Sequence, residues 1–240
     1  MKALFAYEKD ILLHSGRLVL PALLLVAYIG IAYAIAPLDI LSSFSIGALV
    51  VFVLSLSAGV MSAGLSSPMI EQAMLVKLKR KGPFFLSRAL LMAALAAAFA
   101  LVSVAGPLLI HFATGATLFK RPVTEADALS GLALFWLASY CGGISGLFTS
   151  SRLIRGRRTA ILLSAAFCVL AVVKGALVKK AAFFAYILWI LPPVHDLTVA
   201  YSAESTMVFG VVWLYFLWML CYAAAMTAVY AVLMTRRRFE

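Results

Sequence analysis

Six long apolar runs, joined by short connections, constrain most strongly what this chain can fold into. The runs cover residues 18–36, 44–65, 84–112, 129–150, 159–178 and 208–234. A helix needs about 20 consecutive apolar residues to cross the hydrocarbon core of a bilayer, where it satisfies its own backbone polar groups. The sequence therefore predicts an all-α membrane protein with six transmembrane helices, in which residues 1–240 form a single transmembrane domain.

The composition excludes a soluble domain and gives the cysteines a simple interpretation. The chain is 65% hydrophobic and 12% charged, whereas soluble domains are about 45–50% apolar and about 25% charged. The connections between the runs are too short to build a separate domain outside the membrane. Cys141, Cys168 and Cys221 all fall inside apolar runs, so we interpret them as small hydrophobic residues and not as a disulfide framework.

The basic residues predict how the chain is oriented. The formal net charge is +11, but the basic residues stand at the ends of the apolar runs, so we expect no nucleic-acid partner. If the N-terminus is cytoplasmic, 15 of the 20 basic residues lie in cytoplasmic segments. The other five are Lys120, Arg121, Lys174, Lys179 and Lys180. The positive-inside rule then predicts that both termini are cytoplasmic.

Two shorter segments complete the expected architecture. Residues 1–17 place Leu4, Phe5 and Leu12 on one side of a helix, which favours an amphipathic helix in the membrane interface over a solvated leader. Residues 179–207 include an apolar stretch, 181–194, that is short for a span and ends in two prolines. We expect an outer re-entrant segment here, with a seventh span as the alternative. In the predicted domain, residues 18–66 contain spans one and two, residues 84–178 contain spans three to five, and residues 208–240 contain span six and the basic tail.

Small residues recur every four positions in two of the predicted spans. They are Ser55, Gly59 and Ala63 in the second, and Ala138, Gly142 and Gly146 in the fourth. Such stripes let helix backbones approach closely, so they predict a tight helix pair or a subunit interface. The sequence Gly143-Ile144-Ser145-Gly146 also resembles the nucleophile motif of rhomboid proteases. No histidine follows in the last span to serve as a base, so packing is the better interpretation.

The chain lacks the usual motifs for chemistry of its own. It has no phosphate-binding loop and no histidine, cysteine or carboxylate set at metal-ligand spacing, so we expect no cofactor and no metal. The acidic residues lie outside the centres of the runs, which disfavours ion-coupled transport. Lys174 lies near a span end, where its side chain can reach the interface.

The connection after the second run is the most informative one. Residues 67–83 read SPMIEQAMLVKLKRKGP, with Ser67 and Pro68 suited to begin a short helix and Gly82-Pro83 to end it. Apolar positions trace one side, while Glu71, Gln72 and Lys77 fall on the other. This pattern predicts a docking helix on the cytoplasmic face, and the alternative is a linker helix lying on anionic lipid.

Two stretches resemble the permease subunits of type-2 ABC exporters. In that family a glutamate follows span two, and a proline with a later basic residue opens span three. In this chain Glu71, Pro83 and Arg88 stand in those places, within the stretch SPMIEQAMLVKLKRKGPFFLSRALL. The second stretch, LWILPPVHDLTVAYS, resembles the outer segment before the family's last span. The resemblance implies a half-transporter made of two permease chains, identical or homologous. Two ATPase subunits on the cytoplasmic side would bind ATP and Mg. The 67–83 helix would couple to them through Glu71, Gln72 and Lys77.

The function implied by this resemblance is export driven by a separate ATPase subunit. The chain itself would not be an enzyme, and its cargo would be an amphipathic or hydrophobic peptide, drug or lipid. The resemblance implies that the protein lies in the plasma membrane, in contact with membrane lipid, and is of bacterial origin. Two alternatives stay open: a membrane anchor or scaffold subunit that transports nothing, and an unrecognised intramembrane enzyme.

Overall fold

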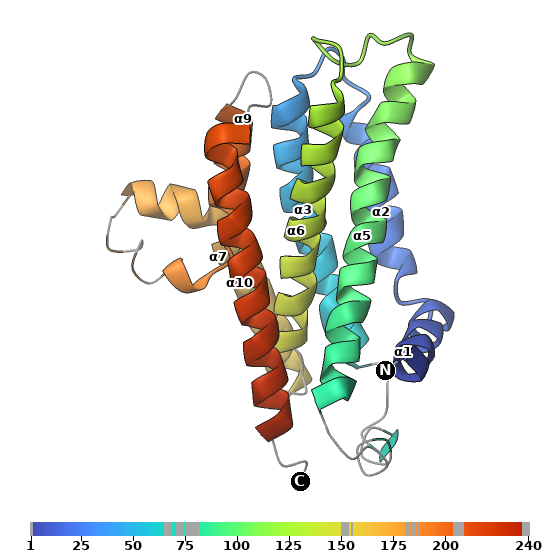
Figure 1. Cartoon of the computed structure of the whole chain (residues 1–240), viewed down its shortest axis with the longest axis vertical. Helices are drawn as coiled ribbons and strands as arrows, with labels where there is room; N and C mark the ends of the chain where they lie inside the picture. The colour runs from blue at the N-terminus through green and yellow to red at the C-terminus, as the bar shows by residue number, and fades with distance from the viewer. Residues whose placement is uncertain are drawn as a thin grey trace.

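The computed structural model describes residues 2–64, 82–149, 156–180, 188–203 and 209–236, together with the single residues 69, 70, 74, 154, 183 and 186. The helices are α1 (Lys2–His14), α2 (Val19–Ala32), α3 (Ile40–Ala63), α5 (Gly82–Ala113), α6 (Glu125–Phe148), α7 (Arg157–Lys180), the 3-10 helix η1 (Leu188–Ile190), α9 (Val194–Ala203) and α10 (Phe209–Arg236). Within the described part of the chain the structure is all-helical, as predicted. The long helices run side by side, and α1 lies at the same end of the bundle as the end of α10 (Figure 1).

Five helices are long and apolar enough to cross a membrane. They are α3, α5, α6, α7 over Arg158–Lys180, and α10 over Val212–Arg236. This confirms an integral membrane protein with transmembrane helices at five of the six predicted runs. The first run differs: α2 has 14 residues and spans about 21 Å at 1.5 Å per residue, less than a hydrocarbon core of about 30 Å. It reaches the length of a span only together with α1, from which it is bent by 68°.

Side-chain caps explain why two spans begin earlier than their apolar runs. The Asp39 carboxylate accepts a hydrogen bond from the Ser42 backbone N–H, so α3 starts at Ile40 and not at residue 44. Thr124 and Asp127 form a reciprocal capping box, so α6 starts at Glu125. These acceptors satisfy backbone N–H groups that have no partner within the helix, which lets a helix extend into polar sequence.

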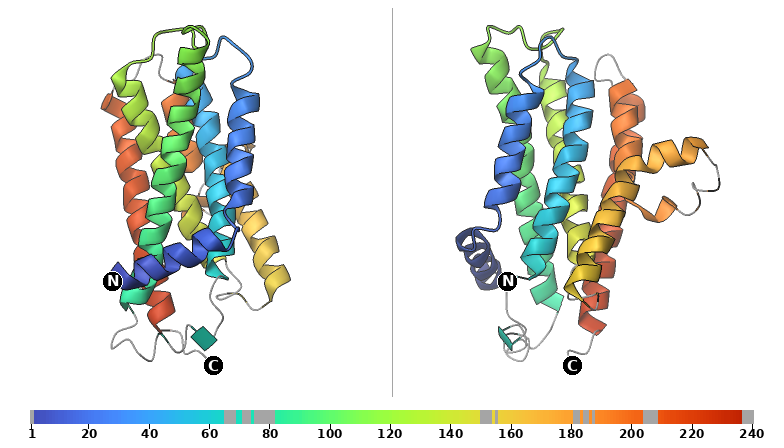
Figure 2. Two further views of the ribbon diagram at one scale, coloured as in Figure 1. Left: turned by 90° about the vertical axis from the view of Figure 1, so that its right-hand side faces the viewer. Right: turned by 180° about the vertical axis from the view of Figure 1, so that it is seen from behind.

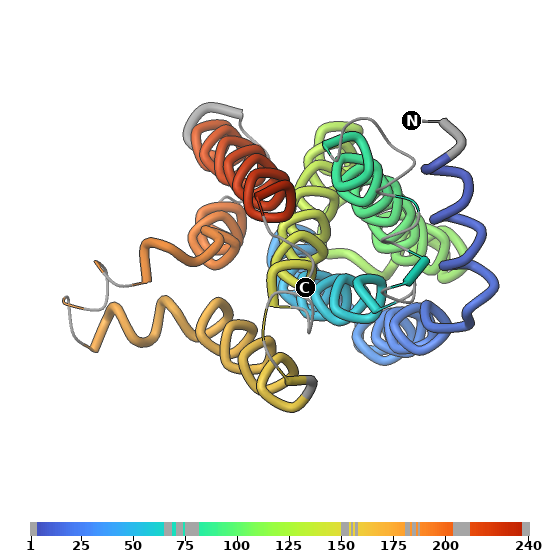
Figure 3. Tube along the Cα trace, turned by 90° about the horizontal axis from the view of Figure 1, so that it is seen from below, coloured from blue at the N-terminus to red at the C-terminus, as the bar shows by residue number. Residues whose placement is uncertain are grey.

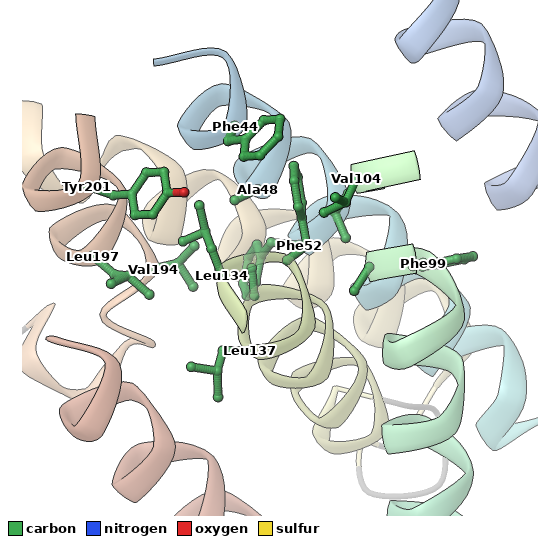
Figure 4. Packing of buried hydrophobic residues seen from close by; sticks show 14 of the residues in the cluster. Phe44, Ala48, Phe52, Phe99, Val104, Leu134, Leu137, Val194, Leu197 and Tyr201 are labelled. Atoms are coloured by element: carbon green, nitrogen blue, oxygen red, sulfur yellow. The ribbon is translucent and has the colours of Figure 1, made fainter. Parts of the chain in front are cut away.

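The core lies between α3 and α6, which pack against each other more extensively than any other pair of described helices. Seen along the bundle, α2 and α5 lie on one side of this pair, while α7, α9 and α10 lie on the other (Figure 3). Figure 4 shows side chains of α3, α5, α6 and α9 gathered in one apolar core, among them Phe44, Phe52 and Leu134.

The first helix lies across the end of the bundle instead of along it (Figure 2). Its buried residue Leu12 joins an apolar cluster with Phe84 and Phe85 of α5 and Tyr230 of α10. Lys9, Asp10 and His14 face away from that cluster and are exposed. This is the arrangement expected of an amphipathic helix that rests on a membrane domain.

The described residues between α7 and α10 include two short helices, η1 and α9, that lie against the bundle. The C-terminal part of α7 projects to the side of the bundle, and α9 returns beside α10 (Figure 2). The Tyr222 hydroxyl of α10 donates a hydrogen bond to the Ile190 carbonyl at 2.6 Å, which ties η1 to the last span. With 10 residues, α9 is too short to cross a membrane. The predicted re-entrant path of residues 179–207 falls partly outside the described residues.

Candidate functional site

A cavity lies at the α1 end of the bundle, between α3 and α7. Its volume is about 1050 Å³, at the upper end of the roughly 300–1,000 Å³ of small-molecule sites. Its walls come from the second half of α3, the first half of α7 and the turn between α1 and α2. The aliphatic side chains that line it include Leu20, Leu56, Val60, Met61, Ile161 and Val169.

Several of the residues that α7 contributes to the cavity wall are small. Ala160, Ser164 and Ala165 face the cavity from α7, and Gly64 ends α3 at its rim. None of these side chains is long enough to fill the space between the two helices. On its other side α3 is held by α6, so α3 cannot move toward α7 without leaving its main packing partner.

The polar groups of the cavity wall are already satisfied by their own helices. The Ser57 hydroxyl donates a hydrogen bond to the Leu54 carbonyl at 2.6 Å, and the Ser164 hydroxyl donates to the Ala160 carbonyl at 2.8 Å. A hydroxyl that bonds back to its own helix offers little to a ligand. The wall therefore behaves as an apolar surface.

Among the described lining residues, one carries a permanent charge, and it stands at the rim. Arg17 lies in the turn between α1 and α2, is exposed, and donates one hydrogen bond from Nη1 to the Met61 carbonyl at 2.9 Å. That carbonyl belongs to the last turn of α3, where the helix dipole favours a cation. A guanidinium carries five N–H donors, so the other donors of Arg17 remain at the mouth of the cavity. The described residues that line the cavity include no carboxylate.

The predicted small-residue stripes lie between α3 and α6 of the same chain. A Cβ atom added to Gly142 would overlap the Phe52 carbonyl, and one added to Gly146 would overlap the Leu56 carbonyl. At Gly59 the same addition would overlap the backbone of α6. Ala63 and Ala138 are buried, and the Ser55 and Ser139 hydroxyls share a hydrogen bond of 2.6 Å across the pair.

Ser145, the serine of the motif that resembles a protease nucleophile, is a packing residue in this geometry. It is buried, and its hydroxyl donates to the Cys141 carbonyl one turn earlier at 2.7 Å. His111 and His195 lie on α5 and α9, toward the opposite end of the bundle from Ser145. Among the residues that the structure describes, no three of His, Cys, Asp and Glu gather into a metal site.

The predicted coupling residues Glu71, Gln72 and Lys77 lie outside the described residues. Two neighbours in the same segment are described. Met69 is exposed, while Met74 packs against the apolar cluster formed by α1, α5 and α10.

A buried ion pair that the sequence analysis missed joins α1 to α5. The Arg88 Nε donates to Glu8 Oε1 at 3.0 Å, and the Ser87 hydroxyl donates to Glu8 Oε2 at 2.9 Å. Both charged side chains are 6% exposed, and the guanidinium lies over the Phe84 ring. The signal was present in the sequence: Glu8 stands between Leu4 and Leu12 on the apolar side of α1, where an acid requires a partner.

Two more ion pairs hold the other end of the bundle. Arg121 donates two hydrogen bonds to the buried carboxylate of Asp127, at 2.7 and 2.8 Å. This hydrogen bonding raises the pKa of Arg121 above its ordinary value, and partial burial acts in the opposite direction. The Lys174 ammonium of α7 pairs with Asp196 of α9 at 2.6 Å, so Lys174 binds a neighbouring element instead of reaching the membrane surface alone.

Comparison with protein-family models, with curated proteins and with solved structures finds no match to this chain. The cavity must therefore be interpreted from its own geometry. Its described lining combines an apolar wall with one cation at the rim, and α7 on one side has few buried residues. That combination suits the binding of an amphipathic molecule better than covalent catalysis.

Proposed function

We propose that this chain is the membrane-spanning subunit of an ATP-driven exporter that moves an amphipathic or hydrophobic cargo out of the cell. ATP and Mg are bound by separate ATPase subunits, and the permease performs no covalent chemistry. The observation that carries the proposal is the cavity between α3 and α7, which opens at the α1 end of the bundle. The resemblance of residues 67–91 to the permease family adds the ATPase partner, the plasma membrane and a bacterial origin.

The packing around the cavity supports a transport role because one wall is fixed and the other is not. Transport requires two conformations that differ in their affinity for cargo. The α3 wall is locked to α6 by backbone contacts at its glycine positions. The α7 wall has few buried residues: 17% of its most apolar 18-residue stretch is buried, against 72% in α6. A shift of α7 changes the cavity and leaves the α3–α6 pair intact.

A second permease chain, identical or homologous, is part of the proposal. The outer faces of α7 and α10 are exposed and carry large apolar residues. Examples include Val173, Leu214 and Trp218. In the dimer we propose, these helices provide the surface for the partner chain, and cargo enters beside them.

The buried contact between α1 and α5 supports a path for coupling. In the proposed assembly the ATPase subunits contact the face that carries α1 and the 67–83 segment, with Glu71, Gln72 and Lys77 as the contact residues. Because Glu8 and Arg88 form a buried pair, a displacement of α1 is transmitted to the start of α5. The N-terminal helix then moves together with the bundle and does not float on the membrane surface.

The test is copurification followed by ATP hydrolysis. The chain is expressed with the ABC ATPase encoded next to its gene, purified through a tag on the chain, and reconstituted into lipid. We expect the ATPase to copurify and its hydrolysis to depend on the permease. Glu71→Ala is expected to lower this stimulated hydrolysis with unchanged membrane insertion, while Glu125→Ala, an exposed acid at the start of α6 and at the opposite end of the bundle from α1, leaves it unchanged. If no ATPase subunit binds, the exporter proposal is wrong; if Glu71→Ala has no effect, the 67–83 segment is not the coupling element.

A further inference from the structure

The position of Arg17 indicates how deep in the membrane the cavity between α3 and α7 lies. Arg17 lies directly after α1, an amphipathic helix that lies across the end of the bundle (Figure 2). Helices of this kind rest at the level of the lipid head groups. The cavity therefore runs from head-group level, at Arg17, into the part of the bundle that faces hydrocarbon, at Val53 and Val169.

The lining of the cavity discriminates between the classes of amphipathic molecule. A peptide would bring backbone N–H and C=O groups that need hydrogen-bond partners, but Ser57 and Ser164 are already bonded to their own helices. A cationic drug would meet Arg17 and no carboxylate in the described lining. A molecule with an alkyl chain and an anionic head leaves no polar group unpaired and places its charge beside the guanidinium.

We propose that the cavity binds an anionic membrane lipid, with an alkyl chain along the apolar wall and the phosphate of the head group on Arg17. Two independent features point to this ligand: the elongated apolar wall, and a permanent cation at head-group depth that keeps free N–H donors. Naming this lipid as the cargo rests on the proposed export function; the binding site itself does not.

The experiment measures lipid binding to the purified chain without any ATPase. The protein in detergent is titrated with phosphatidylglycerol and with phosphatidylcholine of the same acyl chains, and bound lipid is counted by native mass spectrometry. We expect phosphatidylglycerol to bind about fivefold more tightly, the gain typical of one basic residue near an anionic surface. Arg17→Gln keeps a polar amide but removes the charge, so it is expected to abolish the preference, whereas Arg17→Lys retains it.

Matched controls separate this site from general charge and general hydrophobicity. Arg158→Gln removes an exposed charge at the start of α7, outside the cavity lining, and is expected to leave the preference intact. Ala165→Trp fills the cavity and is expected to reduce binding of both lipids, whereas Ala166→Trp, on the neighbouring exposed position, does not.

The outcomes distinguish this inference from the export proposal. Equal binding of the two lipids by the wild-type chain, or a preference that survives Arg17→Gln, overturns the anionic-lipid site. If lipid binding depends on Arg17 but no ATPase copurifies with the chain, the lipid site is supported and the exporter proposal is wrong. If the chain shows no head-group preference but exports an uncharged amphiphile with ATP, the exporter proposal is supported and the anionic-lipid site is wrong.

Discussion

The α3–α6 pair and helix α7 are all apolar helices of transmembrane length, yet they pack very differently. Over its most apolar 18 residues α7 is more hydrophobic than the corresponding stretch of α6, yet fewer of those residues are buried. The difference follows from residue size. Gly142 and Gly146 bring the α6 backbone against α3, while α7 presents branched aliphatic side chains such as Leu162 and Val173 outward. In lipid, close packing of small residues drives helix association, and hydrophobicity does not.

This comparison assigns different tasks to the two regions. The α3–α6 pair is a fixed frame, cross-linked by the hydrogen bond between Ser55 and Ser139. Two polar contacts extend the frame, from Trp136 of α6 to the α5 backbone and from Tyr140 of α6 to Thr227 of α10. α7 is attached to α9 by the Lys174–Asp196 pair. Motion in the bundle is therefore expected at α7 first.

The largest expected effect comes from breaking the frame. Gly142→Leu inserts a side chain where the Phe52 carbonyl lies, so α3 and α6 must separate. Overpacking of a core costs about 1–3 kcal/mol, and more where backbone is the obstacle. We expect loss of the folded, monodisperse protein in size-exclusion chromatography and a large fall in Tm. Gly30→Leu on α2 is the control, because a Cβ there has nothing within 4 Å. Equal Tm values for the two variants would contradict the close-packed frame.

The second effect concerns the junction of α1 with α5. Glu8→Ala leaves the Arg88 guanidinium in a buried site without its carboxylate partner, and removal of one member of a buried pair costs about 3–5 kcal/mol. We expect faster proteolysis of α1 and a lower Tm. The control is Asp10→Ala, whose side chain is exposed and forms only a surface pair with Lys9. If both variants resist protease like the wild type, α1 is not held by this pair.

A smaller effect is expected where α7 meets α9. Asp196→Asn removes the carboxylate that binds the Lys174 ammonium. Asp196 is partly exposed, so the loss is reduced by solvent and should be about 1 kcal/mol. We expect faster amide hydrogen exchange in α9 with little change in α3 or α6. Glu125→Gln, an exposed acid at the start of α6, serves as the control. Faster exchange throughout the bundle would show that α7 belongs to the frame.

The smallest expected effect is a pH dependence of the same contact. Burial lowers the pKa of His195, Lys174 and Lys179 lower it further, and Asp196 raises it. Because the packed state favours neutral His195, acidification should weaken the α7–α9 contact. The weakening begins near the ordinary histidine pKa of about 6.5 and is complete below the lowered value. Hydrogen exchange of α9 at pH 7 and pH 5 measures it. His195→Gln should remove the pH dependence, and a variant that keeps it would assign the titration to another group.

Several features of the fold could be predicted because they depend on local sequence. Length and apolarity identified the helices α3, α5, α6, α7 and α10, since a backbone in hydrocarbon has few alternatives to a helix. The first predicted span was less well described by its apolar run. Residues 18–36 have the composition of a span, but α2 ends at Ala32, and only the tertiary structure sets the bend that joins it to α1.

The candidate site divides in the same way. The sequence by itself determined which positions are small, which are apolar and which are charged, including Gly142, Gly146 and the basic residues at span ends. Only the tertiary structure decided that α6 packs on α3, that Glu8 meets Arg88, and that a cavity with Arg17 at its rim lies between α3 and α7. The physical reason is distance along the chain: the helical state is chosen by neighbouring residues, whereas a cavity depends on side chains separated by more than a hundred positions.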